Sequence, residues 1–229
     1  MTRVVQAIVF DFDGVIANSE PLHLKAFQQA LAEDGLDLPA AEYYARYLGY
    51  DDVGMFEALA KDRGLAMSGG RVAALVSRKG EWMQEMLRTG SVLFPGATDF
   101  IREAAASVPI AIASGALRHE IDDIIDAAGV SDLFSTIVAA GDTPESKPSP
   151  APYRLAFERL RETSGRNLDP RRSVAIEDSK WGLESAQGAG LRLVGVTNSY
   201  PAHELTGAEL VVDGLRALTL PALDRLCAT

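Results

Sequence analysis

Several features are scarce in this chain of 229 residues, and each absence narrows the class of protein. The single cysteine, Cys227, lies near the C-terminus and has no second cysteine to pair with, which fits a reducing compartment. No stretch approaches the roughly 20 apolar residues of a membrane span, and the apolar run 4–10 is too short for a signal peptide. The sequence therefore predicts a cytoplasmic protein without a membrane partner.

Positive charge is also in short supply. The chain has 32 acidic and 22 basic residues, which gives a formal net charge of −10. Nucleic acids and anionic membranes repel such a protein, so we expect no nucleic-acid partner and favour a small molecule. No protein partner is indicated. If the small molecule is an anion, a metal ion, a lysine or a helix N-terminus must supply positive charge at its site.

Short runs rich in valine and isoleucine alternate with segments of helical periodicity. The predicted strands are 4–10, 108–113, 135–140, 173–177, 191–196 and 208–212. The helices predicted between the later strands are 97–106, 118–128, 151–162 and 180–189. This alternation is typical of an α/β fold with a doubly wound, Rossmann-like parallel sheet that has helices on both faces.

A long insertion separates the first two predicted strands. Residues 11–107 are far more than one crossover helix needs. The helices predicted within this region are 21–35, 52–64 and 71–88, the first with Ser19 as its N-cap. We expect a helical cap domain over 18–93, inserted into an α/β core of 1–17 and 94–229. The alternative is one large sheet domain with additional helices.

Polar residues follow four of the predicted strands at the points where these end. They are Asp11 and Asp13 after 4–10, Ser114 and Gly115 after 108–113, Lys147 beyond 135–140, and Glu177 and Asp178 at the end of 173–177. Each alone is an ordinary turn, cap or loop residue. Because ligands bind outside the carboxyl ends of parallel strands, the four groups together predict one site at that edge of the sheet.

The chemistry of these residue types points to phosphoryl transfer. Asp11 and Asp13 are two residues apart, so an extended backbone directs both side chains to one face. Carboxylates at 11, 13, 177 and 178 repel each other unless a hard cation bridges them, and Mg²⁺ prefers such oxygen ligands. Lys147 and the backbone N–H groups after Ser114 are suited to bind phosphoryl oxygens.

Four motifs in this order resemble those of the haloacid dehalogenase-like (HAD) phosphohydrolases. They are "DFDGV" at 11–15, "ASG" at 113–115, "KPSP" at 147–150 and "EDS" at 177–179. The resemblance covers essentially the whole chain. With a helical cap between the first two motifs, it is closest to the branch that holds β-phosphoglucomutase and sugar-phosphate phosphatases. It implies a Mg²⁺-dependent phosphatase that hydrolyses a small phosphorylated metabolite, a sugar phosphate, through an aspartyl-phosphate intermediate.

The resemblance also implies a role for each site residue. Asp11 is the nucleophile, and Asp13 is the general acid and then the base, with its backbone carbonyl on Mg²⁺. Asp178 is a metal ligand, and Glu177 is a further ligand or a partner of the ligands. His23 aligns with a hinge histidine of β-phosphoglucomutase. The implied catalytic residues are Asp11, Asp13, Ser114 and Lys147, and the implied phosphate- or substrate-binding residues are Ser114, Gly115, Lys147 and His23.

Two positions separate the branches of the family. Dehalogenases lack an acid at the position of Asp13, since expelling a halide needs no proton. β-Phosphoglucomutase grips a second phosphate with a cap arginine, whereas residues 50–52 here are Tyr-Asp-Asp. These acids favour hydrolysis over mutase transfer. Three cations can compensate and keep the mutase as the alternative: Arg46, Lys79 and Arg118.

Other classes of protein fit the sequence less well. A phospho-receiver domain also combines acids with a lysine, but it carries its phosphorylated aspartate on a middle strand and has no helical insert. A nucleotide-binding module needs a glycine-rich turn after the first strand, whereas "GAGLRL" at 188–193 precedes a strand and is typical of a helix C-terminus. The three histidines show no zinc-binding spacing with the cysteine. A catalytically silent interaction protein does not require the complete set of Asp11, Asp13, Lys147 and Asp178.

Overall fold

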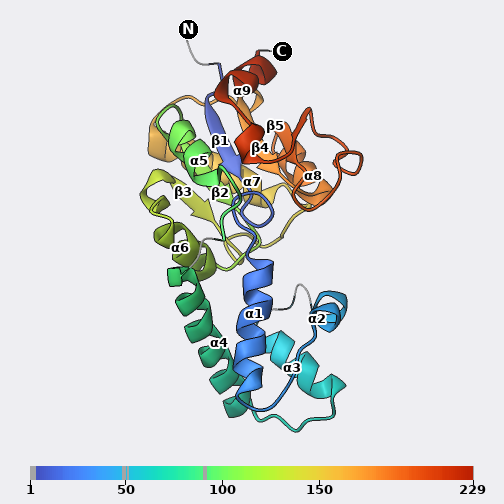
Figure 1. Ribbon diagram of the computed structural model, residues 1–229. Helices are drawn as coiled ribbons and strands as arrows, with labels where there is room; N and C mark the ends of the chain where they lie inside the picture. The colour runs from blue at the N-terminus through green and yellow to red at the C-terminus, as the bar shows by residue number, and fades with distance from the viewer. Residues whose placement is uncertain (1–3, 48–49, 51, 90–91, 229) are drawn as a thin grey trace. The chain divides into compact units, whose positions relative to one another are not determined.

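A computed structural model describes residues 4–47, 50, 52–89 and 92–228 of the chain. The chain divides into two compact units, a core unit of residues 1–18 and 92–229 and a helical unit of residues 19–91. Figure 1 draws both along the chain. Among the described residues, none of the helices is long and apolar enough to cross a lipid bilayer.

The core unit is built on a six-stranded parallel sheet with the order β3-β2-β1-β4-β5-β6 (Figure 1). The strands are β1 (Ala7–Phe10), β2 (Ile110–Ala113), β3 (Thr136–Val138), β4 (Ser173–Glu177), β5 (Arg192–Val196) and β6 (Leu210–Val212). β1 pairs with β2 on one side and with β4 on the other, so the strand order reverses at β1. The predicted α/β fold with a doubly wound parallel sheet is confirmed.

Helices cover both faces of this sheet. They are α5 (Ala97–Ala105), α6 (Arg118–Ala127), α7 (Ala151–Ser164), α8 (Lys180–Gly188) and α9 (Leu220–Cys227), with 3₁₀ turns η1 (Ser131–Leu133), η2 (Pro170–Arg172) and η3 (Leu215–Ala217). Helices α7 and α8 share a core with Ala7 and Val9 of β1. Phe10 points to the opposite face, where its ring centroid lies 6.1 Å from that of Phe100 in α5. Burial on both faces explains why β1 is apolar without alternation.

The first strand is shorter than predicted. The prediction began at Val4, but the backbone N–H groups of Val4 and Val5 both donate to Asp224 Oδ1, at 2.8 and 2.9 Å. Asp224 belongs to α9, a helix that the sequence pattern did not predict. The N–H groups of Val4 and Val5 therefore bond to a side chain from the far end of the chain in place of a neighbouring strand.

Helix α8 ends where the sequence indicates. Gly190 follows it with φ of +82°, a conformation that favours glycine at a helix C-terminus. The glycines at 188–190 thus end a helix, and they form no nucleotide-binding turn. Within α8, the buried Ser185 hydroxyl donates to the carbonyl of Ser149 at 2.5 Å. This bond ties α8 to the "KPSP" segment.

In the described residues of the helical unit, four helices surround an apolar core of their own. They are α1 (Glu20–Ala32), α2 (Ala40–Arg46), α3 (Asp52–Asp62) and α4 (Gly69–Thr89). The ring of Phe27 packs against those of Tyr43 and Phe56, with centroids 5.8 and 5.3 Å apart. Ser19 occupies the N-cap position of α1, but its side chain makes no capping hydrogen bond because its backbone is already helical.

The two segments that lead to and from the helical unit pair with each other inside the core unit. The Asn18 N–H donates to the carbonyl of Val92 at 2.8 Å, and the Phe94 N–H donates to that of Ile16 at 2.9 Å. Both connecting segments therefore lie beside the turn that follows β1.

Candidate active site

Asp11 follows β1 directly and is nearly buried, with 9% of its surface exposed. Its N–H donates to the carbonyl of Ile176 at 2.9 Å, which continues the β1–β4 pairing one residue beyond the strand. Its Oδ1 accepts a hydrogen bond from the Phe12 N–H at 2.7 Å. The central strand therefore holds this carboxylate at the carboxyl edge of the sheet.

The chain turns sharply after Phe12. The Phe12 carbonyl accepts hydrogen bonds from three of the N–H groups that follow, and Gly14 adopts φ of +79°. The side-chain amide of Asn198 donates a hydrogen bond to the Gly14 carbonyl at 2.7 Å and stabilises the turn. Asp13 lies on this turn and is exposed, whereas Asp11 is buried. The two aspartates of "DFDG" thus have different surroundings.

Lys147 joins two carboxylates. Its Nζ lies 2.7 Å from Asp11 Oδ1 and 2.6 Å from Glu177 Oε1. The Tyr153 hydroxyl donates to the same Glu177 oxygen at 2.9 Å, and the centroid of the Tyr153 ring lies 4.9 Å from Nζ. Because an ammonium group has three donors, Lys147 can bond one more oxygen beside these two.

The acidic pair at the end of β4 is held by protein donors. Glu177 is fully buried, and its Oε2 accepts hydrogen bonds from the Asp178 N–H at 3.1 Å and from the Ser179 hydroxyl at 3.3 Å. Both oxygens of Glu177 therefore accept hydrogen bonds within the protein. Asp178 is also buried, and it forms a side-chain hydrogen bond with Ser199.

Two glycines leave room for these two carboxylates. A Cβ at position 182, in α8, would lie 1.8 Å from Glu177 Oε1. A Cβ at position 14 would lie 1.8 Å from Asp178 Oδ2. Both distances are far below van der Waals contact, so only Gly182 and Gly14 let the acids occupy these positions.

Ser114 and Gly115 lie at the end of β2. The Ser114 N–H donates to the carbonyl of Val138 at 2.9 Å, and its hydroxyl oxygen accepts from the Ala116 N–H at 3.0 Å. A pocket of about 260 Å³ in the core unit is lined by Ser114, Gly115 and Lys147, among other residues. Three of the four residues predicted to bind phosphate or substrate, Ser114, Gly115 and Lys147, thus line one pocket.

Three carboxylates and one ammonium group are packed together here. One oxygen each of Asp11, Glu177 and Asp178 lies within 4.8 Å of the others. Burial and the charge of Glu177 raise the pKa of Asp11 well above its usual value, although Lys147 opposes the shift. Burial raises the pKa of Asp178 to about 6, against the hydrogen bond with Ser199. Burial disfavours the charged form of Lys147, but Asp11 and Glu177 outweigh it and raise the pKa of the lysine.

The composition of this cluster suits a magnesium ion. Three carboxylates beside one ammonium leave an excess of negative charge, and the charge of Glu177 adds to burial in raising the pKa of Asp11 and of Asp178. A hard divalent cation with oxygen ligands offsets such an excess. Asp11 and Asp178 are better suited to hold the ion than Glu177, whose oxygens are already engaged by Lys147 and other donors.

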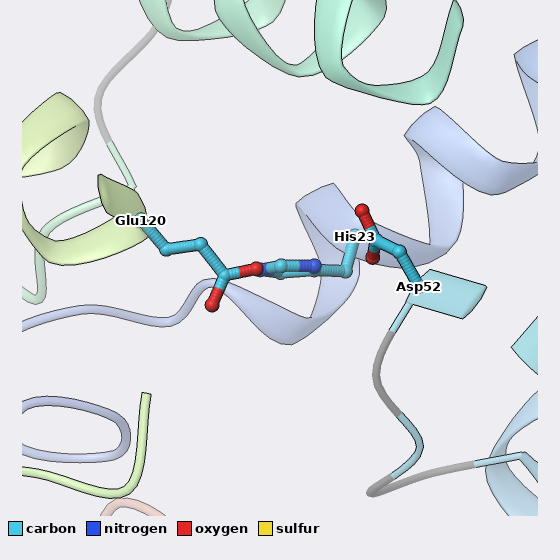
Figure 2. A group of neighbouring side chains, drawn as sticks. All are labelled: His23, Asp52 and Glu120. Atoms are coloured by element: carbon cyan, nitrogen blue, oxygen red, sulfur yellow. The ribbon is translucent and has the colours of Figure 1, made fainter. Parts of the chain in front are cut away.

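His23 belongs to the first turn of α1, in the helical unit. Lys79 Nζ lies 3.0 Å from His23 Nδ1 and 2.8 Å from Asp52 Oδ1. Figure 2 shows the side chains of His23 and Asp52; Glu120, also labelled there, belongs to α6 of the core unit. Lys79 is 2% exposed and also lies over the ring of Phe27. The charge of Asp52 is therefore paired inside the helical unit.

Four residues that contact the site were not predicted from the sequence: Tyr153, Gly182, Asn198 and Ser199. Asn198 and Ser199 come shortly after β5, so the strand-end reasoning that found the other residues applies to them as well. Tyr153 and Gly182 lie inside helices, where the sequence pattern indicates only packing. Their contacts with Glu177 follow from the tertiary structure alone.

Comparison with known proteins places the chain in a family. Residues 8–196 match the model of the haloacid dehalogenase-like hydrolases, a span that contains all four motifs. The chain belongs to the haloacid dehalogenase-like hydrolases. It is thus an enzyme, and this membership decides against the phospho-receiver and interaction-protein alternatives.

Individual relatives align over most of the chain. The chain is 32% identical to protein CbbY of Rhodobacter capsulatus, over 97% of this chain and 99% of that protein. It is 27% identical to a phosphoglycolate phosphatase of Pectobacterium atrosepticum, over 91% and 88% of the two chains. A mutant CbbY from Rhodobacter sphaeroides, solved in complex with xylulose-(1,5)bisphosphate, has a similar structure with a TM-score of 0.73. It is 30% identical, over 93% of this chain and 95% of that chain.

Proposed function

We propose that this chain is a Mg²⁺-dependent phosphatase that hydrolyses a small phosphorylated metabolite, a sugar phosphate, through an aspartyl-phosphate on Asp11. The observation that carries the proposal is the Lys147 ammonium group bound between Asp11 and Glu177. Phosphoryl transfer depends mainly on positioning and on stabilising charge. A buried carboxylate with a cation fixed beside it supplies both.

The reaction has two steps. An oxygen of Asp11 attacks phosphorus, and the bond between phosphorus and the alcohol oxygen breaks while Asp13 gives a proton to the departing alcohol. Asp13 then takes a proton from a water molecule, whose oxygen attacks phosphorus and releases inorganic phosphate and Asp11. The exposed position of Asp13 supports this role, because the residue must meet both the alcohol and water.

The pocket beside Lys147 is the proposed phosphate site. Its ammonium group, the Ser114 hydroxyl and the backbone around Gly115 bind the phosphoryl oxygens. Their shared pocket supports this assignment.

Mg²⁺ is the proposed cofactor. Its proposed protein ligands are Asp11, Asp178 and the backbone carbonyl of Asp13, with Glu177 as the partner that positions Lys147. When bound, the ion supplies positive charge to the phosphoryl oxygens. The excess negative charge of the cluster supports this assignment.

We also propose that the helical unit acts as the cap domain expected over residues 18–93. The compact unit at 19–91, with its own core and its two paired connecting segments, supports this proposal. A role for His23 in substrate binding stays a prediction.

The ion pairs favour hydrolysis over mutase transfer. Each cation that can bind a second phosphate already has an acidic partner in its own unit: Arg46 with Asp62 at 2.7 Å, Lys79 with Asp52 at 2.8 Å, and Arg118 with Asp122 at 2.9 Å. A second phosphate must displace one of these acids. The pairing of Asp52 with Lys79 also weakens the repulsion between Asp52 and a phosphate, so the paired state of the three cations favours hydrolysis more strongly than the acids do. Asp51 lies outside the described residues.

The relatives support the substrate class. CbbY of Rhodobacter sphaeroides binds xylulose-(1,5)bisphosphate as a mutant, and the Pectobacterium relative is named for phosphoglycolate. Both compounds are small and phosphorylated, as the proposal requires.

A phosphate-release screen tests the function. It covers sugar, polyol and nucleotide monophosphates, phosphoglycolate and xylulose 1,5-bisphosphate, with Mg²⁺ and with EDTA. We expect release from a subset only with Mg²⁺, and a loss of turnover of at least about a thousandfold in Asp11→Asn. Asp126→Asn, which changes an exposed acid on α6, is the matched control. Near-wild-type turnover in Asp11→Asn would exclude Asp11 as the nucleophile.

The same screen with a bisphosphate primer tests the mutase alternative. Interconversion of sugar 1- and 6-phosphates that depends on the primer, without net release of phosphate, identifies a mutase.

A further inference from the structure

Tyr153 lies in the first turn of α7, only six residues after Lys147, and is fully buried. Its side chain contacts two groups of the site at once. The hydroxyl donates to Glu177 Oε1 at 2.9 Å, and the ring lies beside the Lys147 ammonium at 4.9 Å from Nζ to the centroid.

These two contacts act on the same ion pair. Glu177 Oε1 accepts from both Tyr153 and Lys147, so the hydroxyl fixes the oxygen toward which the ammonium group points. A lysine side chain has a flexible four-carbon stem and adopts a single position only when its surroundings restrict it. The aromatic ring restricts it on one side through a cation–π contact, while Asp11 and Glu177 bind the ammonium group directly.

We propose that Tyr153 is a positioning residue for the phosphoryl-transfer reaction: its hydroxyl orients Glu177 and its ring orients Lys147, which together direct the ammonium group toward Asp11 and the phosphoryl oxygens. This inference rests on the proposed function. Tyr153 itself touches neither Asp11 nor the reacting atoms in any described contact. Its hydroxyl remains a donor, because burial and the charge of Glu177 raise its pKa.

Two substitutions separate the parts of the side chain. Tyr153→Phe keeps the ring and removes only the hydroxyl, whereas Tyr153→Leu removes both. Phe157→Leu is the matched control, because Phe157 lies one helical turn further along α7 in the same apolar core. All three variants change buried packing in one helix, so thermal unfolding measures how far each destabilises the fold.

Two readouts test the positioning role. Steady-state kinetics gives kcat and KM separately. The ¹⁵N-edited NMR spectrum gives the ammonium signal of Lys147, assigned by its loss in Lys147→Met, in metal-free protein without substrate. The NMR measurement does not depend on activity, so it can fail or succeed independently of the proposed function, which Asp11→Asn tests.

We expect Tyr153→Phe to lower kcat about tenfold with KM within about twofold, because a hydrogen bond to a charged acceptor is lost. The Lys147 signal should move in Tyr153→Phe and also lose its ring-current shift in Tyr153→Leu, which should have the lower kcat. Phe157→Leu should lower the melting temperature while kcat and the Lys147 signal stay unchanged. The proposal is overturned if Tyr153→Phe leaves kcat and the signal unchanged, or if Phe157→Leu reduces kcat to the same extent.

Discussion

The Cα atom of Gly182 lies directly against the carboxylate of Glu177, so that a methyl group at position 182 would stand 1.8 Å from Glu177 Oε1. Helix α8 and the end of β4 can approach this closely only because residue 182 has no side chain. Glu177 in turn bonds Lys147, and Lys147 bonds Asp11. The position of Lys147, which bonds the proposed nucleophile Asp11, therefore depends on a glycine inside a helix.

Gly182→Ala should displace Glu177 and impair the site. In a helix interior, alanine is normally more stable than glycine. Here, however, the overlap of the added methyl group with Glu177 should lower the free energy of unfolding by about 1–3 kcal/mol and kcat by at least about tenfold. Gly80→Ala is the control, since Gly80 lies inside α4 with nothing within 4 Å of its Cβ position. It should be neutral or stabilising by up to about 1 kcal/mol in urea unfolding. Equal stability and kcat in Gly182→Ala and wild type would contradict the packing.

Lys147→Met should destabilise the metal-free protein as well as abolish turnover. It leaves the fully buried Glu177 without its cation, so we expect a loss of about 3–5 kcal/mol in the free energy of unfolding at neutral pH. The double variant Lys147→Met/Glu177→Gln should regain most of this stability but no activity, because the buried charge of Glu177 is gone and the phosphate ligand is still missing. Lys180→Met, at an exposed lysine, controls for the loss of one surface charge. An equally destabilised double variant would show that the unpaired charge of Glu177 is not the cause.

Asp13→Asn should separate the two steps of the reaction. With an alkyl phosphate, both protonation of the alcohol and activation of water need Asp13, so kcat should fall by about 10²–10⁴. With p-nitrophenyl phosphate the leaving group needs no proton, and we expect a burst of nitrophenolate followed by slow turnover as the aspartyl-phosphate accumulates. Stopped-flow absorbance measures the burst. An unchanged rate with the alkyl phosphate would exclude Asp13 as the acid and base.

The metal-free protein should lose stability as the pH rises from about 4 to about 6. Burial raises the pKa of Asp178 from its usual 3.8 to about 6, so in this window the folded state keeps a proton that the unfolded chain has lost. The free energy of unfolding then falls with pH by about 1.4 kcal/mol for each unit of pKa difference. The pKa of Asp11 is raised too and adds to the slope. Mg²⁺ should restore stability above pH 6.

Thermal melts from pH 4 to 8, with EDTA and with Mg²⁺, check this dependence. Asp178→Asn should make the free energy of unfolding depend less steeply on pH, because this carboxyl group no longer titrates. It should also reduce the stabilisation by Mg²⁺. Identical pH profiles for wild type and Asp178→Asn would show that Asp178 does not titrate in this window.

The fold was predictable because its strands are short and apolar and are separated by segments with helical periodicity. The first strand differs from its prediction because of a long-range contact: Val4 and Val5 bond to Asp224, more than 200 positions along the chain, and no local pattern contains that information. The helix that carries Asp224 was missed as well. Tyr153 shows the same limit within the site, because its sequence position indicates only a helix face in the core.

The α/β class follows from the amino-acid sequence alone, as do the strand ends at Asp11, Ser114 and Asp178 and the loop with Lys147 that follows another strand, because parallel strands in a doubly wound sheet end at the same edge. The burial of Asp11, the exposure of Asp13 and the hydrogen bonds of Glu177 with Lys147 and Tyr153 become visible only in the folded chain. Those relationships depend on how closely α7 and α8 approach the sheet, a distance set by side-chain packing and by Gly182. Packing of this kind is a property of contacts between segments that are far apart in the chain.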